Sequence, residues 1–114
     1  MVQYSPLDRT FGALADPTRR AVLERLGAGA ATVSELAAPA GISLTGMKKH
    51  LRVLQEAGLV RTEKVGRSRR CELAPGRLDE ARALIDDYRQ MVEQRFDRLE
   101  AVLDETKGTD DEQQ

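Results

Sequence analysis

The segment from Ser43 to Gly58 constrains the fold most, because its sequence specifies both the ends and the two faces of a helix. Ser43 suits the N-cap position and Gly58 suits the position just past the C-terminus, which predicts a helix of about four turns. Gly46 leaves the backbone uncovered near the start of the outer face, so a large partner can approach closely there. Apolar Leu44, Met47, Leu51 and Leu54 share one face, and Thr45, Lys49, Arg52 and Glu56 share the other.

Two capped helices are predicted before this segment. Ser5 precedes Pro6 and Asp16 precedes Pro17, so each pair places a capping side chain before a proline at the first helical position. The first helix is short, and the second ends near Gly27. In the first helix we expect Leu7, Phe11 and Leu14 to share one face. In the second helix we expect an inner face with Val22, Leu23 and Leu26. Its outer face is expected to carry Arg19, Arg20 and Arg25.

A third, very short helix is predicted from the capping-box residues Thr32 and Glu35, whose side chains can each accept a hydrogen bond from a free backbone N–H. Pro39 and Gly41 are expected to stop it within about two turns, leaving residues 39–42 as a turn. A short helix, a turn with glycine and a longer helix with a basic outer face form a helix-turn-helix.

The periodicity changes after Gly58. Residues 59–65 and 68–73 are typical of two strands joined by Gly66-Arg67, which predicts a two-stranded hairpin. An isolated hairpin is marginally stable in water, so we expect it to pack on the helices. Its tip forms a basic wing with Lys64, Arg67, Arg69 and Arg70.

A long last helix is predicted from Leu78 to about Thr106, after the Pro75-Gly76 break. Apolar residues recur every seven positions and are widened by others into a stripe too broad for so small a domain to cover alone, which implies a partner helix. Residues 108–114 contain no apolar side chain and are expected to form a disordered acidic tail. The repeating positions are Leu78, Ile85, Val92 and Leu99, and those that widen the stripe are Ala81, Leu84, Tyr88, Met91, Phe96, Val102 and Leu103.

The composition limits the possible functions. With 114 residues and 40% hydrophobic content, residues 1–107 are expected to form one domain. No apolar run approaches the roughly 18 residues of a membrane span, and the N-terminus lacks the pattern of a signal peptide, so we expect a cytoplasmic protein with no membrane partner. One cysteine excludes an internal disulfide framework, and one histidine leaves little for a metal site. We therefore expect no cofactor.

The net charge of −1 conceals a segregation of charge along the chain. Residues 45–76 carry eight basic and three acidic side chains, whereas residues 77–114 carry six basic and twelve acidic ones. Such runs are more often only solvated surface, but a basic block in a nearly neutral chain is typical of a polyanion-binding patch. Its position on the helix-turn-helix and the wing favours double-stranded DNA as the partner.

These elements and motifs together resemble the ArsR family of winged helix-turn-helix bacterial repressors. The resemblance implies a mainly α fold with a small β-hairpin, in the order α-α-α-α-β-β-α. It also implies a homodimer formed by the first and last helices, with the fourth helix in the DNA major groove and the wing on the flanking backbone. The matching motifs are ALADPTRRAVLERL at 13–26, TVSELA at 32–37, KKHLRVLQEAGLV at 48–60 and VGRSRRCEL at 65–73.

The sequence therefore predicts a repressor that binds an inverted repeat as a homodimer. Near the helix N-terminus, Thr45 and Gly46 are expected at base edges, whereas Lys49 and Arg52 are expected at phosphates and Lys48 is left open. The full DNA-binding set is Ser43, Thr45, Gly46, Lys48, Lys49, Arg52, Lys64, Arg67, Arg69 and Arg70. The expected dimer interface is Leu7, Phe11, Tyr88, Val92, Phe96, Leu99 and Leu103.

The chain departs from the family pattern at two places. Metal-sensing members carry paired cysteines on the third helix or histidine and acidic ligands on the last, whereas this third helix has VSELAA and this last helix has no histidine. We therefore expect a branch without the family's metal sites and no metal partner. In the fourth helix Lys48 replaces the usual serine, so a contact made by that hydroxyl is not assumed here.

Other functions receive less support from the sequence. His50 lies at the border of the helix faces, where a lone histidine is usually structural. Cys71 follows Arg69 and Arg70, whose charges favour a thiolate and leave a redox-responsive regulator open, although a strand cysteine is more often simply half-buried. The sequence contains no paired carboxylates, no phosphate loop and no Ser/His/Asp set, so we do not expect an enzyme. A winged-helix protein-interaction module would need apolar anchors where the outer face is basic.

Overall fold

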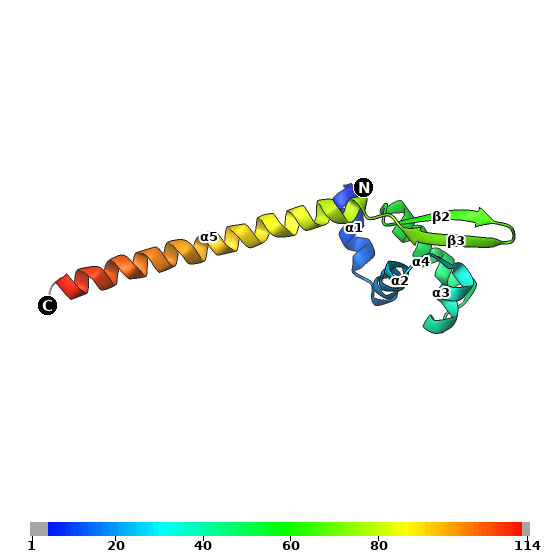
Figure 1. Cartoon of the computed structure of the whole chain (residues 1–114), viewed down its shortest axis with the longest axis horizontal. Coiled ribbons are helices and arrows are strands. Elements are labelled where there is room, and N and C mark those ends of the chain that lie inside the picture. Colours follow the sequence, from blue (N-terminus) through cyan, green and yellow to red (C-terminus); the bar gives the residue numbers. More distant parts are fainter. Residues whose placement is uncertain (1–4, 113–114) are drawn as a thin grey trace, which may run out of the picture. The chain divides into compact units, whose positions relative to one another are not determined.

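The structure is a computed structural model that describes residues 5–112, with side chains for residues 5–106. The chain divides after Ala81 into two units, which we describe separately. The first unit contains three short helices, a small sheet and a longer helix, followed by the start of the last helix, whose remainder forms the second unit (Figure 1). The elements are α1 (Pro6–Leu14), α2 (Pro17–Gly27), β1 (Ala31–Thr32), α3 (Val33–Ala40), α4 (Leu44–Glu56), β2 (Val60–Val65), β3 (Ser68–Leu73) and α5 (Gly76–Glu112).

The predicted caps of α1, α2 and α4 are confirmed. The Ser5 hydroxyl accepts a hydrogen bond from the Asp8 N–H, and the Asp8 carboxylate accepts one from the Ser5 N–H. Asp16 accepts from the Arg19 N–H at 2.9 Å and begins α2. Ser43 accepts from the Gly46 N–H at 3.0 Å and begins α4. These bonds satisfy backbone donors that have no partner inside the helix.

The third helix begins as predicted, but only half of its capping box forms. Thr32 Oγ1 accepts from the Glu35 N–H at 3.2 Å, whereas the Glu35 carboxylate accepts from the Thr32 hydroxyl instead of its backbone N–H. Thr32 is also the last residue of β1, where it lies opposite Arg70 in the sheet. The Glu35 carboxylate lies 3.7 Å from the Arg25 guanidinium, so it also ties α3 to α2.

The predicted turn at residues 39–42 is displaced. The third helix continues through Pro39 and ends at Ala40, so Gly41 begins the turn in the left-handed conformation with φ 66°. Pro39 cannot donate a backbone hydrogen bond to the Glu35 carbonyl, but only one residue of the helix follows it. The Gly41 and Ile42 N–H groups still close the end by donating to the carbonyls of Ala38 and Ala37.

The sheet has three strands in the order β1-β3-β2, one more than the predicted hairpin. The hairpin itself is confirmed, with Val65 opposite Ser68 and Gly66 at φ 61° in the connection. The additional strand is β1, which pairs antiparallel with β3. Two residues are too few to show the alternating pattern that identifies a strand, which explains why the sequence did not indicate it.

The core of the first unit lies between the helices and the sheet. The α4 side chains Met47, Leu51 and Leu54 are buried as predicted, but Leu44 is 48% exposed. Leu44 is the first residue of α4, where it lines a groove instead of reaching the core. The core cluster also contains Ala13, Val22, Leu26, Ala31, Val33, Leu36, Ala37, Ala57, Leu59, Val60 and Cys71.

Replacing Gly58 by alanine is expected to destabilise the protein more than replacing Gly41. Both glycines have positive φ, 74° and 66°, which costs other residues about 1–2 kcal/mol. A Cβ atom at Gly58 would also lie 2.8 Å from Cγ of Arg77, whereas one at Gly41 would meet nothing within 4 Å. Urea denaturation of the two variants measures this difference, and a Gly41→Ala loss equal to the Gly58→Ala loss would contradict it.

The last helix is longer than predicted. It begins at Gly76 instead of Leu78 and ends at Glu112 instead of near Thr106, so its backbone continues into the segment 108–114 that the sequence predicts as a tail. Residues 113 and 114 lie outside the described residues. Within residues 5–112, no helix is both long and apolar enough to cross a membrane. Exposed apolar residues of α5, here called the α5 stripe, are Ile85, Tyr88, Met91, Val92, Phe96, Leu99, Val102 and Leu103.

Candidate nucleic-acid interface

A groove of about 290 Å³ lies between the start of α3, the start of α4 and the wing hairpin. Four of its side chains are cationic and no acidic side chain lines it. We call it the basic groove. It brings Lys48 of α4 next to Lys64, Arg67 and Arg69 of the wing, which are four of the ten predicted DNA-binding residues. The other lining residues are Thr32, Val33, Ser34, Leu44 and Ser68.

The two faces of the wing carry different charges. Lys64 lies opposite Arg69 and Thr62 lies opposite Cys71, so Lys64 and Arg69 share the sheet face that contains the buried Cys71. Arg69 Nη1 donates to Thr62 Oγ1 at 2.8 Å on that same face. The cationic side chains of this face therefore lie toward the helices, where they line the basic groove.

Arg70 lies on the other face of the wing, opposite Glu63. Its guanidinium lies 3.9 Å from the Glu72 carboxylate, which also pairs with Arg61 at 3.3 Å. Acidic groups therefore offset the positive charge of this face. The structure separates Arg70 from the three other predicted wing residues. Because successive side chains of a strand point to opposite faces, the sequence could have predicted that Arg69 and Arg70 lie on different faces.

The polar face of α4 is exposed where the sequence predicts contacts. Thr45, Lys48, Lys49 and Arg52 are all exposed. Lys48 follows Leu44 by one turn and lines the basic groove, whereas Lys49 and Arg52 do not. Lys48, whose role the sequence left open, is thus placed with the wing.

The first turn of α4 leaves the backbone accessible at Gly46. A Cβ atom there would meet only the Ser43 Oγ, at 3.3 Å, among atoms outside its own helix backbone and chain neighbours. Ser43 itself is exposed, but its hydroxyl is engaged by the Gly46 N–H. Ser43 therefore caps the helix, and Gly46 offers a close approach to a partner.

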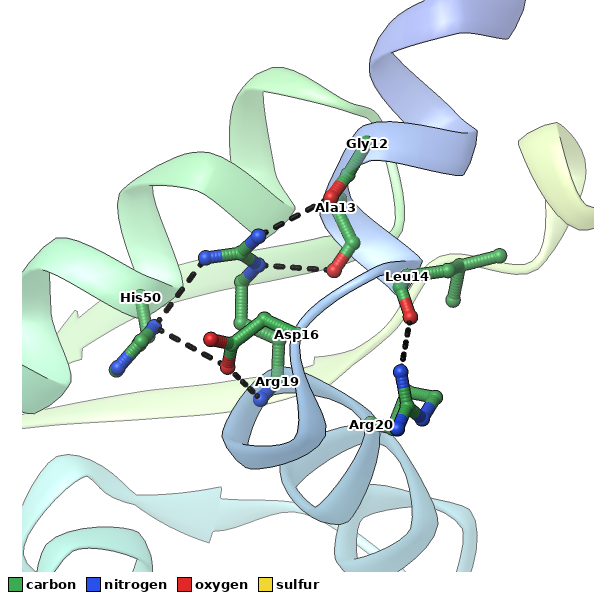
Figure 2. A network of polar contacts seen from close by, with 7 residues as sticks. All are labelled: Gly12, Ala13, Leu14, Asp16, Arg19, Arg20 and His50. Carbon is green, nitrogen blue, oxygen red and sulfur yellow. Dashed lines mark hydrogen bonds and ion pairs between the residues drawn. The ribbon is translucent and has the colours of Figure 1, made fainter.

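A polar network joins α1, α2 and α4 (Figure 2). Arg19 Nε donates to the Ala13 carbonyl at 2.8 Å and Nη2 donates to the Gly12 carbonyl at 3.1 Å. Arg19 Nη1 lies 3.5 Å from His50 Nδ1. Arg20 Nη1 also donates to α1, at the Leu14 carbonyl, at 2.8 Å. The side chains of Arg19 and Arg20, expected to lie free on the outside of α2, instead bind the carbonyl end of α1.

Asp16 lies at the centre of this network as the cap of α2. The backbone N–H of Arg19 donates to its carboxylate and holds the pKa of Asp16 below its usual value, which the nearby charge of Arg19 reinforces. Asp16 Oδ2 lies 3.9 Å from His50 Nδ1, too far for a hydrogen bond. No sequence pattern predicts this network, because it depends on where α1 ends relative to α2 and α4.

The predicted dimer residues are divided between the two units. Leu7 and Phe11 are half-buried on α1, and the α5 positions Tyr88, Val92 and Phe96 are exposed, as are Leu99 and Leu103. Apolar side chains so exposed along one helix indicate a surface for a partner. Contact between copies of the chain through these residues stays a prediction.

Cys71 is fully buried in the core on β3. Burial raises the pKa of its thiol, and the charge of Arg69 opposes that effect only in part. Arg69 thus favours the thiolate as expected, but burial outweighs its effect, and the redox-responsive alternative stays untested. Among the side chains of residues 5–106, no three histidine, cysteine, aspartate or glutamate groups lie together as a metal site. The absence of a metal response nevertheless stays a prediction.

Comparison with known proteins matches residues 14–63 to a helix-turn-helix domain. The HTH-type transcriptional regulator Rv2034 of Mycobacterium tuberculosis is 40% identical over 88 residues, which cover 77% of this chain and 82% of that protein. The solved structure of RHA00566, an ArsR family transcriptional regulator, is 43% identical with a TM-score of 0.74, covering 78% of this chain and 98% of that one.

A more distant structure shares the fold. It is the homodimeric winged helix-turn-helix DNA-binding domain of Mb0332 from Mycobacterium bovis, described as a possible ArsR-family regulator. It is 24% identical, with a TM-score of 0.61, over 79% of this chain and 91% of that one. The element order around the basic groove is therefore that of a winged helix-turn-helix.

Proposed function

The chain belongs to the ArsR family of helix-turn-helix transcriptional regulators, and on this premise we propose that it is a repressor that binds an inverted-repeat operator as a homodimer. The observation that carries the proposal is the basic groove, where Lys48 of α4 converges with Lys64, Arg67 and Arg69 of the wing. Four cations without an acidic neighbour in the lining suit the phosphates of double-stranded DNA. Such a repressor would act in the cytoplasm, where bacterial DNA lies.

The reading helix is α4, the second helix of the helix-turn-helix. Its N-terminal part would enter the major groove, where Thr45 can reach base edges and Gly46 lets the backbone come close. Lys49 and Arg52 would bind phosphates on either side, and the basic groove would hold the backbone beside the wing. Phosphate contacts fix the register, and the contacts of α4 supply the sequence preference.

Two features support a homodimer. The α5 stripe exposes apolar side chains over several successive helical turns, from Ile85 to Leu103. The structure from M. bovis that shares the fold is described as homodimeric. A two-fold dimer would place its two α4 helices about 34 Å apart, so half-site centres should lie about 10 base pairs apart on one side of the duplex. Operator symmetry would then reflect protein symmetry.

The decisive experiment is selection of bound sequences from a random duplex pool, followed by footprinting on the DNA upstream of the protein's own gene. Enrichment of a palindrome with this spacing is the expected result. A pool that yields no palindrome, at a salt concentration where the protein is dimeric, would instead favour a winged-helix module that binds another protein.

Replacing Thr45 by alanine is expected to weaken the selected site by about 1–3 kcal/mol, with little change on unrelated DNA, because its contact would be to a base edge. The matched variant is Arg52→Ala on the same face of α4. Its phosphate contact would be lost on every sequence alike. Fluorescence anisotropy with both duplexes measures each variant, and a Thr45→Ala loss as large on unrelated DNA as on the selected site would exclude base reading by Thr45.

A further inference from the structure

We propose that Arg19 and His50 are positioning residues for α4, because their contact fixes the helix rotation that the DNA-reading side chains require. The inference rests on the proposed function, in which α4 reads DNA. The observations concern the polar network of Figure 2, which the DNA contacts do not use.

The guanidinium of Arg19 has a fixed direction. Two of its nitrogens bind the Ala13 and Gly12 carbonyls at the end of α1, at 2.8 and 3.1 Å. Since a guanidinium is planar, these two bonds also determine where the third nitrogen points. That nitrogen, Nη1, lies 3.5 Å from His50 Nδ1 on α4. Arg19 therefore joins the end of α1 to the middle of α4 through one rigid group.

The rest of the α4 packing is less directional. Met47, Leu51 and Leu54 hold the helix through buried apolar contacts, which oppose its removal from the core but restrain rotation only through shape. The His50 ring is half-buried, with 26% of its side chain exposed, at the border of the apolar and polar faces. A hydrogen bond at this border restrains the rotation of α4 and hence the directions of its exposed side chains.

The contact requires one protonation state of His50. Arginine can only donate, so Nδ1 must accept and the imidazole must be neutral, with its proton on Nε2. The charged groups beside Nδ1 are the Arg19 guanidinium and the Asp16 carboxylate, which is 3.9 Å away and already accepts the Arg19 backbone N–H. Asp16 thus holds the start of α2, from which Arg19 reaches α4.

Binding to the selected operator tests the contact through four variants. His50→Leu and Arg19→Met remove it and are expected to weaken the operator about tenfold or more, with little loss on unrelated DNA. His50→Asn keeps an acceptor oxygen near the Nδ1 position and should remain within about threefold of wild type. Arg25→Met is the matched control, because Arg25 is also on α2 but binds Gly29 and Glu35 instead.

A second measurement needs no DNA. His50 is the only histidine of the sequence, so the nitrogen resonances of its imidazole are unambiguous once any histidine tag is removed. We expect a neutral ring protonated at Nε2 in wild type, with that preference reduced in Arg19→Met. A ring protonated at Nδ1 in wild type, or a His50→Leu variant that keeps full operator preference, would overturn the proposal. If wild type selects no operator, the proposed function fails, while the resonances still decide whether the contact exists.

Discussion

Replacing Leu99 and Leu103 together by glutamate is expected to give a monomer that no longer holds an inverted repeat. These side chains are 55% and 57% exposed on α5, and a partner helix would bury both. Two carboxylates in an apolar interface oppose association strongly, because each loses water without gaining a partner. Without the second subunit only one half-site is bound, so operator affinity should fall by about 10²–10⁴-fold.

Sedimentation at micromolar concentration measures the first part of this result. Wild type should sediment as twice the chain mass of 12.6 kDa and the double variant as a single chain. Gln90→Glu with Gln94→Glu is the matched control, since both positions lie on the opposite side of α5 and gain the same charge. A wild-type protein of 12.6 kDa would contradict the homodimer, whereas a Leu99/Leu103 variant that stays dimeric would contradict an interface formed by these α5 residues.

Reversing the charge of Lys64 and Arg69 is expected to reduce DNA affinity by about 10³-fold or more at 0.1 M salt, on all sequences alike. If each subunit makes three or four phosphate contacts, the dimer makes about six to eight and its log–log salt slope is about −5 to −7. Removing two contacts per subunit should flatten that slope by about 3 to 4. Binding measured across a salt series gives both quantities.

Arg70→Glu is the control for this prediction. Its position lies two residues from Glu72 on the wing face that does not line the basic groove, so Arg70→Glu should alter affinity far less than the equal change of charge in Arg69→Glu. Equal losses from Arg70→Glu and Arg69→Glu would show that the wing does not use one face selectively. Arg69→Ala alone should weaken every sequence modestly and flatten the slope slightly.

Much of the first unit could be predicted because local chemistry determines it. Caps such as Ser5 with Asp8 and Ser43 with Gly46 join residues three positions apart, and Gly66-Arg67 sets the hairpin connection. The order of the helices and the hairpin followed from these local signals, and the role of α4 in reading DNA stays a prediction. These parts required no knowledge of how distant segments pack.

The parts that the sequence missed depend on distant contacts. Arg19 binds carbonyls six and seven residues earlier, and its neighbour His50 is 31 residues later, so no helical or strand period relates them. β1 exists only because β3 pairs with it. The different surroundings of Arg69 and Arg70, by contrast, follow from strand alternation and could have been predicted by assigning each residue of the wing to a face.

The strand order β1-β3-β2 leaves β2 as an edge strand whose second side pairs with nothing in the described part of the chain. Free N–H and C=O groups along such an edge can recruit a strand from another molecule and start aggregation. Arg61, Glu63 and Lys64 place charged side chains along this edge, and such side chains oppose edge-to-edge pairing of two copies. Replacing the charged residues of β2 by apolar ones would therefore weaken DNA binding and also make the edge prone to aggregation. Reversing their charge would weaken DNA binding but leave the edge charged.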